Sequence, residues 1–116
     1  MITLGGEEVG FKYSTEEQWT GKYDTDGKKI YRRYVEWNIK SAPNIYMTHN
    51  WNVKRYEIIY GDWTEANTKV RYWFPYSYAN SNEHLSIRDL STNTVVLSSS
   101  WNATVRLTLE YTCNDR

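Results

Sequence analysis

Two adjacent glutamates, Glu16 and Glu17, are the nearest approach to a catalytic pair in this sequence. In an extended chain, neighbouring side chains point to opposite faces. The two carboxyl groups therefore cannot converge on one glycosidic bond, as the acid pair of a glycosidase must. If residues 14–17 instead form a helical turn, they read as a short capping segment. Both interpretations give the pair a structural role.

The other residues that could do chemistry are isolated in the sequence. Neither His49 nor His84 has a second histidine, cysteine or acidic residue at the spacing of a metal site, and we interpret His49 as a hydrogen-bonded structural or interface residue. Cys113 has no second cysteine with which to form a disulfide. The serine run 98–100 lacks the glycines of a nucleophile elbow. We therefore expect no enzyme activity, no catalytic residue, no metal and no cofactor.

Tryptophan and tyrosine are the unusual part of the composition. The chain has 116 residues, of which 16% are aromatic, with 6 Trp and 11 Tyr against 2 Phe. A core of this size cannot bury six tryptophans completely, so we expect some at a subunit contact or on a binding face. Exposed aromatic rings stack on sugar rings, while Asn, Asp and Arg bond the hydroxyl groups.

This mixture of aromatic and polar residues occurs in two loop-like segments, 62–67 and 76–83, and in the strand before the second. For each aromatic residue, packing in the core or at an interface is the alternative to ligand binding. The candidate ligand-binding residues are Trp63, Trp73, Tyr76, Tyr78, Asn80 and Asn82.

The charge balance excludes some classes of partner. Lys plus Arg and Asp plus Glu both number 14, so the chain has no net charge. A nucleic-acid-binding domain needs a basic face to neutralise phosphates, and the basic groups here are short and interrupted. The chain has no long apolar run and no recognisable secretory signal at its start. We expect neither nucleic-acid binding nor insertion into a membrane.

The elements that must position these residues are strands, because the apolar residues alternate with a period of two. In the last strand one face is apolar and should be buried, and the other is polar and should face water. Pro75 removes a backbone donor, so its strand is either at an edge or broken there. The predicted strands are 18–23, 29–39, 54–60, 69–78, 84–90, 95–99 and 104–112.

Turn signals separate several of these strands. The segment Asp24–Gly27 predicts a hairpin in which Gly27 supplies a positive φ, and residues 91–94 predict a second hairpin. Short strands separated by frequent turns are typical of an all-β fold. We predict an antiparallel β-sandwich or jelly-roll-like domain of about seven to eight short strands.

The order of motifs from Tyr13 to Tyr34 resembles the C-terminal head domain of bacteriophage and prophage tail-fibre proteins. A His-Asn pair at His49 and a final strand at 104–112 fit the same pattern. The motifs are Tyr13–Glu17, Gly21–Tyr23, Asp26–Lys28 and Ile30–Arg32.

The resemblance implies a β-sandwich head at the distal end of a tail fibre or tail tip. Such heads are usually homotrimers, and they bind a polysaccharide or protein on the host cell. They belong to the virion, which is assembled in the bacterial cytoplasm. The resemblance makes residues 13–116 the head and residues 1–12 a lead-in, which could end a preceding fibre segment. The resemblance identifies no binding residue. The scaffold positions that it marks are Tyr13, Glu16, Glu17, Gly27 and His49.

Three functions stay open at this point. The first is a receptor-binding head that recognises a host cell-surface glycan. The second is a structural domain that trimerises a tail fibre, with the surplus aromatic residues in the subunit interface. The third is a carbohydrate-binding module or lectin of a bacterial protein.

Overall fold

Eleven strands form in the part of the chain that the computed structural model describes, residues 2–4, 7–9, 16–77 and 82–116. All the strand pairs are antiparallel. The strands are β1 (Ile2–Leu4), β2 (Glu7–Val9), β3 (Gln18–Tyr23), β4 (Lys29–Ile39), β5 (Ala42–Thr48), β6 (Val53–Glu65), β7 (Arg71–Phe74), β8 (Tyr76–Ser77), β9 (His84–Ser91), β10 (Thr94–Ser99) and β11 (Ala103–Cys113).

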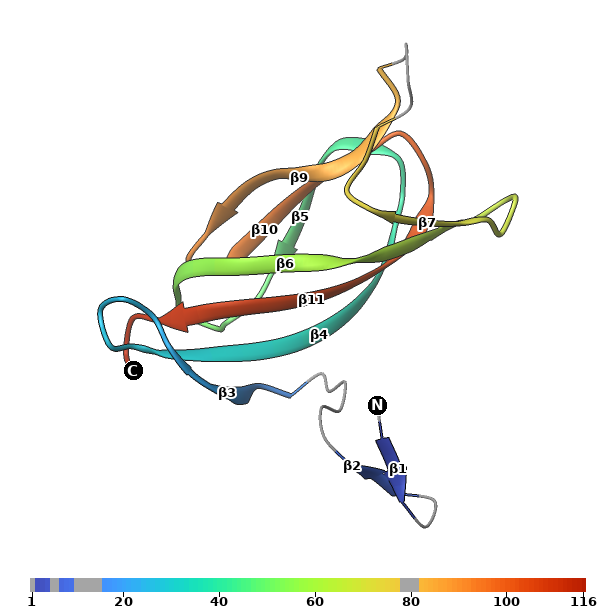
Figure 1. Ribbon diagram of the computed structural model, residues 1–116. Coiled ribbons are helices and arrows are strands. Elements are labelled where there is room, and N and C mark those ends of the chain that lie inside the picture. The colour runs from blue at the N-terminus through green and yellow to red at the C-terminus, as the bar shows by residue number, and fades with distance from the viewer. Residues whose placement is uncertain (1, 5–6, 10–15, 78–81) are drawn as a thin grey trace.

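Nine of these strands form two sheets (Figure 1). One sheet has five strands in the order β3-β4-β11-β6-β7, and the other has four in the order β5-β10-β9-β8. Strands β1 and β2 form a separate hairpin. The predicted β-sandwich is confirmed. Within the described ranges, no helix has the length and apolar character needed to cross a membrane.

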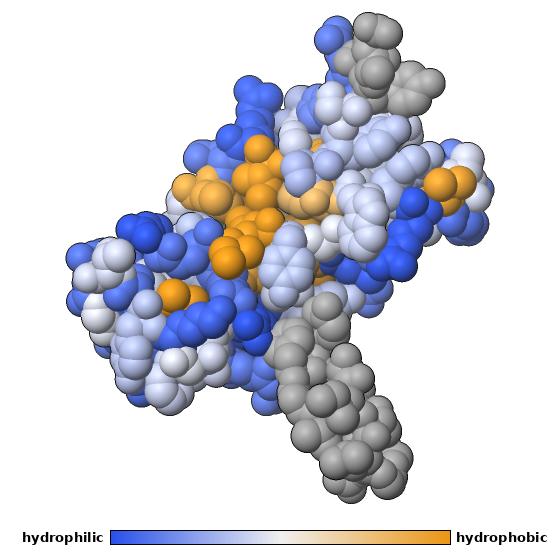
Figure 2. Space-filling view, in the orientation of Figure 1, coloured by the Kyte–Doolittle hydropathy of each residue, from blue (hydrophilic) through white to orange (hydrophobic). Residues whose placement is uncertain are grey.

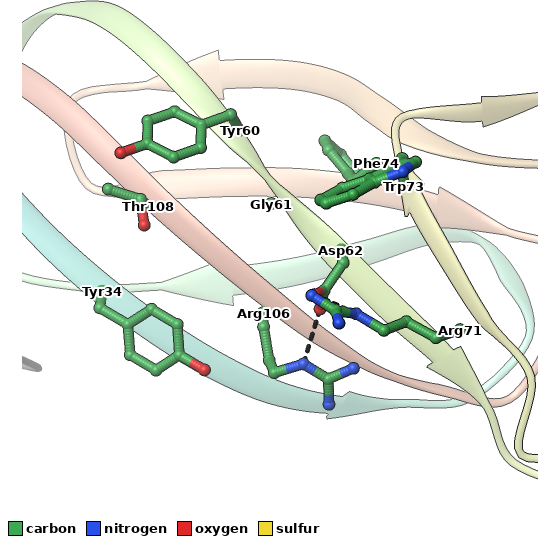
Figure 3. A pocket seen from close by; sticks show the side chains of 9 residues that line it. All are labelled: Tyr34, Tyr60, Gly61, Asp62, Arg71, Trp73, Phe74, Arg106 and Thr108. Atoms are coloured by element: carbon green, nitrogen blue, oxygen red, sulfur yellow. Dashed lines mark hydrogen bonds and ion pairs between the residues drawn. The ribbon is translucent and has the colours of Figure 1, made fainter. Parts of the chain in front are cut away.

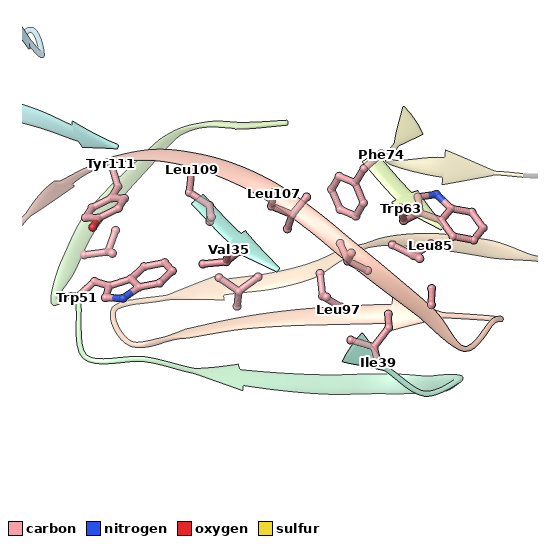
Figure 4. Close-up of a cluster of buried hydrophobic side chains, with 14 of the residues drawn as sticks. Val35, Ile39, Trp51, Trp63, Phe74, Leu85, Leu97, Leu107, Leu109 and Tyr111 are labelled. Carbon is pink, nitrogen blue, oxygen red and sulfur yellow. The ribbon is translucent and has the colours of Figure 1, made fainter. Parts of the chain in front are cut away.

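The inner faces of the two sheets share one core (Figure 4). Leucines and valines fill its centre, and Trp51 and Tyr111 stack at one end with their ring centroids 5.5 Å apart. Burial of these apolar groups is the main force that holds the sheets together. The labelled core residues are Val35, Ile39, Trp51, Trp63, Phe74, Leu85, Leu97, Leu107, Leu109 and Tyr111.

The surface keeps several large aromatic side chains in contact with water. Figure 2 shows apolar residues gathered in the middle of one face, with hydrophilic residues around them. Trp19 is 48% exposed and Trp73 is 74% exposed. The expectation that the core cannot bury all the tryptophans is therefore confirmed.

The first predicted hairpin is confirmed in detail. Strands β3 and β4 have the predicted bounds. The Asp24 carboxylate accepts hydrogen bonds from the backbone N–H groups of Asp26 and Lys28, and these bonds lower its pKa. Gly27 has a φ of +79°, the left-handed conformation that a glycine adopts without strain.

Three differences from the predicted strands concern the middle of the chain. Strand β6 continues past the predicted end at residue 60 to Glu65, so that segment 62–65 is strand and not loop. The predicted strand 69–78 is broken at Pro75, and its two parts, β7 and β8, belong to different sheets. Strand β5 was not predicted; it contains Pro43 and lies at a sheet edge, where proline is tolerated.

Strand β11 differs from the expected pattern of one buried and one wet face. Its inner face is buried as predicted. On the outer face, however, Thr108 is 2% exposed and Glu110 is 5% exposed. Because β11 lies between β4 and β6, the side chains of both neighbours cover it. The prediction of a wet face is therefore wrong for the second half of the strand.

Gly61 lies where β6 comes closest to β11. A Cβ atom at this position would lie 1.9 Å from the backbone carbonyl oxygen of Arg106. No side-chain movement relieves that contact, because the neighbouring atom belongs to the backbone. The close pairing of the two strands therefore requires glycine here.

We predict that Gly61→Ala lowers the free energy of unfolding by about 2 kcal/mol, since β6 and β11 must move apart to accept the methyl group. Urea unfolding measures the loss. The control is Arg55→Ala on the same strand, whose side chain is 56% exposed, and it should change stability by less than about 0.5 kcal/mol. Equal stability of the two variants would contradict the prediction.

Candidate functional site

A groove of about 800 Å³ lies over the outer face of the five-stranded sheet (Figure 3). Its size is within the range of sites for small ligands. Strands β4, β11, β6 and β7 all contribute to it. The lining residues are Tyr34, Tyr60, Gly61, Asp62, Arg71, Trp73, Phe74, Arg106 and Thr108.

The register of the sheet sets the order of these side chains. Thr108 of β11 is paired with Tyr34 of β4 and with Tyr60 of β6, so the two tyrosines lie on either side of it. Two residues earlier on β11, Arg106 is paired with Asp62, which is in turn paired with Trp73. Side chains from four strands thus form consecutive rows across the sheet.

An ion cluster occupies the middle of the groove. Asp62 is 7% exposed. The Nε atom of Arg106 donates to one oxygen of Asp62 at 2.6 Å, and the Nε atom of Arg71 donates to the other at 2.6 Å. Arg106 also donates to the hydroxyl of Thr64 and lies 3.8 Å from the carboxylate of Glu36. Two guanidinium groups therefore neutralise one buried carboxylate and are fixed in place by it.

Aromatic rings form the walls of the groove. Trp73 is 74% exposed and Tyr60 is 42% exposed, whereas Phe74 is buried. The guanidinium carbon of Arg71 lies 5.4 Å from the centroid of the Trp73 ring, within the range of a cation–π contact. The groove therefore combines exposed ring surface with charged hydrogen-bonding groups.

The predicted ligand-binding residues do not form one site. Trp73 lies in the groove. Tyr76 and Trp63 both line a smaller pocket of about 160 Å³, and their ring centroids are 5.5 Å apart. Asn82 is exposed, and its backbone carbonyl contacts the ring of His84 at 2.8 Å.

The burial of Trp63 contradicts the prediction that its ring is available to a ligand. Trp63 is 1% exposed and stacks between Tyr72 and Trp101, with centroid distances of 4.6 and 5.2 Å. Both faces of its ring are covered, so no sugar can stack on it. Tyr78 and Asn80 lie outside the described residues.

The predicted scaffold residues have structural partners. Glu17 accepts hydrogen bonds from the hydroxyl of Tyr111 at 2.7 Å and from Arg116 at 2.5 Å. These bonds connect the start of β3 to the end of β11. Glu16 is exposed, so the two glutamates lie in different surroundings. Tyr13 lies outside the described residues.

His49 is half-buried in a polar and aromatic cluster. Its Nδ1 atom accepts from the backbone N–H of Trp51, so the proton is assigned to Nε2, which lies 2.7 Å from the hydroxyl of Tyr56. That hydroxyl donates to the carbonyl of Ser91. Burial, with a smaller contribution from the positive charge of Arg33, lowers the pKa of His49 to about 4. The interpretation of His49 as a hydrogen-bonded residue is therefore confirmed.

The described ranges contain no group of three or more His, Cys, Asp or Glu side chains that could hold a metal ion. Among the described residues that line the groove, Asp62 is the one carboxylate, and it is held in ion pairs. Burial raises the pKa of the Cys113 thiol.

The sequence did not predict four of the groove residues that could contact a ligand. They are Tyr34, Tyr60, Arg71 and Arg106. They are spread over more than seventy positions of the chain, and only the pairing of β4, β11, β6 and β7 brings them together. One signal was available for Arg71 and Trp73, because residues two apart on a strand share a face.

Comparison with protein-family models, curated proteins and solved structures finds no match for this chain. The fold is therefore known from the structure, and the resemblance to tail-fibre heads stays a prediction.

The lowered pKa of His49 predicts a pH dependence of stability. Between about pH 6.5 and pH 4 the unfolded chain binds a proton at this site and the folded chain does not, so stability falls as the pH decreases through this window. Urea unfolding at pH 7.5 and pH 5 should show a smaller loss for His49→Gln than for the wild type. NMR of the His49 ring provides a direct check, and a midpoint near pH 6.5 would contradict the assignment.

Proposed function

We propose that this chain is a non-enzymatic head domain of a bacteriophage tail fibre or tail tip, and that it recognises a host cell-surface glycan in the groove on the five-stranded sheet. The observation that carries the glycan-binding part is the row of exposed aromatic rings beside a fixed cluster of hydrogen-bonding groups. The attribution to a tail fibre is supported by the motif order between Tyr13 and Tyr34.

The groove has the physical features that bind sugars. A sugar ring has apolar C–H faces and polar hydroxyl edges. Trp73 and Tyr60 offer ring surface for the faces, and Arg71 and Arg106 offer N–H groups for the edges. Because these side chains lie on strands and not on loops, their positions are set before the ligand arrives, which reduces the entropy lost on binding.

The chemistry of the groove supports binding more than hydrolysis. Glycosidases use two carboxyl groups, one on each side of the bond that breaks. Among the described lining residues Asp62 is the single carboxylate, and both of its oxygens accept hydrogen bonds from arginines. Both oxygens of this carboxylate are already occupied, so neither is free to attack a sugar.

In this proposal the head works as a homotrimer at the tail end of the virion. Three grooves on one fibre would each bind weakly, and their combined attachment to a cell surface would be strong because of the high effective concentration. A protein on the host cell is the alternative receptor. A carbohydrate-binding module or lectin of a bacterial protein is the other alternative. It would use the same groove, but the domain would be attached to a bacterial protein and not to a tail fibre.

We predict that Trp73→Ala and Tyr60→Ala each weaken glycan binding by about tenfold or more, since exposed aromatic anchors carry much of the affinity of such sites. A glycan array and intact host cells identify a bound sugar. Calorimetry with the soluble monovalent oligosaccharide then measures the affinity of a single groove.

Trp19→Ala is the matched control, because Trp19 is also an exposed tryptophan but lies on β3, outside the lining of the groove. Its affinity for the oligosaccharide should equal that of the wild type. A folded wild type that binds neither a glycan nor a host cell would refute the proposal.

A structural trimerisation domain is the second candidate. The observation that favours it is an exposed aromatic pair on β3, an edge strand of the five-stranded sheet. Trp19 and Tyr23 are 48% and 56% exposed and pack edge to face at 5.7 Å. Such a pair at a sheet edge is suited to contact another chain.

This candidate predicts that the double variant Trp19→Ser and Tyr23→Ser changes a trimer into monomers, as measured by light scattering. Calorimetry with a bound oligosaccharide separates the two candidates. Monomers that keep the wild-type affinity would support the receptor-binding function. A wild-type trimer that binds no glycan would leave the structural function as the better one.

A further inference from the structure

We infer that the groove prefers acidic saccharides, and that Arg71, assisted by Arg106, binds the carboxylate of a uronic-acid residue. This inference rests on the proposed function and adds the chemical class of the ligand. It follows from the N–H groups of Arg71 that the ion cluster leaves available as hydrogen-bond donors.

The acceptors of the cluster are largely occupied. One oxygen of Asp62 accepts from Arg106 and the other accepts from two nitrogens of Arg71. Since Asp62 is also 7% exposed, it has little capacity left for the hydroxyl groups of a neutral sugar. The charged groups that remain accessible at this place are donors.

Arg71 is the more accessible of these donors. Its side chain is 64% exposed, against 26% for that of Arg106. Asp62 contacts the Nε atom and one terminal nitrogen of Arg71, and the other terminal nitrogen has no hydrogen bond or ion pair to the described residues. A guanidinium group anchored on one side donates to a carboxylate on the other side with little further loss of freedom.

The charges of the groove lining alone sum to plus one. Arg71 and Arg106 contribute two positive charges, and Asp62 contributes one negative charge. Glu36, 54% exposed, lies 3.8 Å from Arg106 and offsets much of the charge there. With Glu36 counted, two carboxylates balance the two guanidinium groups, so the preference for an anion rests on the accessible N–H donors of Arg71.

The position of Arg71 matches a sugar held by the aromatic wall. Its guanidinium carbon lies 5.4 Å from the centroid of the Trp73 ring. A pyranose ring packed on the part of the Trp73 ring that Arg71 does not cover would lie near the guanidinium group. In a hexuronic acid the carboxylate is attached to the ring carbon, at the edge of the ring, where such a neighbour can reach it.

The test compares pairs of oligosaccharides that differ only in this group. Oligogalacturonates, oligoglucuronates and oligomannuronates are each compared with their carboxyl-reduced counterparts by calorimetry at low salt, with the full chain. We expect the acidic member of at least one pair to bind about tenfold more tightly. We expect Arg71→Gln to remove that preference by weakening the acidic member alone, and Arg71→Lys to restore part of it.

Arg88→Gln is the control, because Arg88 is exposed on β9 of the other sheet, and it should leave both affinities unchanged. Thermal unfolding checks that each variant is folded.

The outcomes separate the two levels of the proposal. Suppose that Trp73→Ala weakens binding. Equal affinities for the acidic and neutral members, or an equal loss of affinity for both in Arg71→Gln, would then overturn the inference about acidic sugars alone. If Trp73→Ala changed no affinity, or if no oligosaccharide bound, the groove would not be the glycan site and both proposals would fail.

Discussion

Strand β11 lies between β4 and β6 along nearly its whole length, and the rest of the molecule depends on this double pairing. On its inner face Leu107 and Leu109 are fully buried against the second sheet. On its outer face Thr108 and Glu110 are covered by residues of the flanking strands. Because the backbone of a central strand is paired on both sides, the side chains beside it keep a fixed order. The groove therefore has a rigid base.

The aromatic residues meet two different needs in this fold. In the core, Tyr111 is fully buried, and its hydroxyl donates to Glu17. The ring thus supplies apolar contact while its polar tip bonds a charged group at the margin. On the outer face, Trp73 exposes most of its ring. A composition rich in tyrosine and tryptophan therefore fills a thin core and also leaves aromatic ring surface exposed on the outer face.

The ion cluster fixes two arginine side chains in the groove. A buried carboxylate such as Asp62 is costly unless it is paired, and two arginines pair with it. The same contacts hold both guanidinium groups at the surface of the groove. The arrangement places two cationic hydrogen-bond donors side by side in a chain that has no net charge.

The sequence by itself determined the fold class, the bounds of β3 and β4, and the turn at Gly27, because alternation and turn chemistry are local properties of the chain. It could not distinguish the buried Trp63 from the exposed Trp73, since burial depends on which sheet face each strand presents. It also gave no sign that Tyr34, Tyr60 and Arg106 meet. The tertiary structure decided these points, because the register of four strands that are distant in sequence places their side chains in one groove.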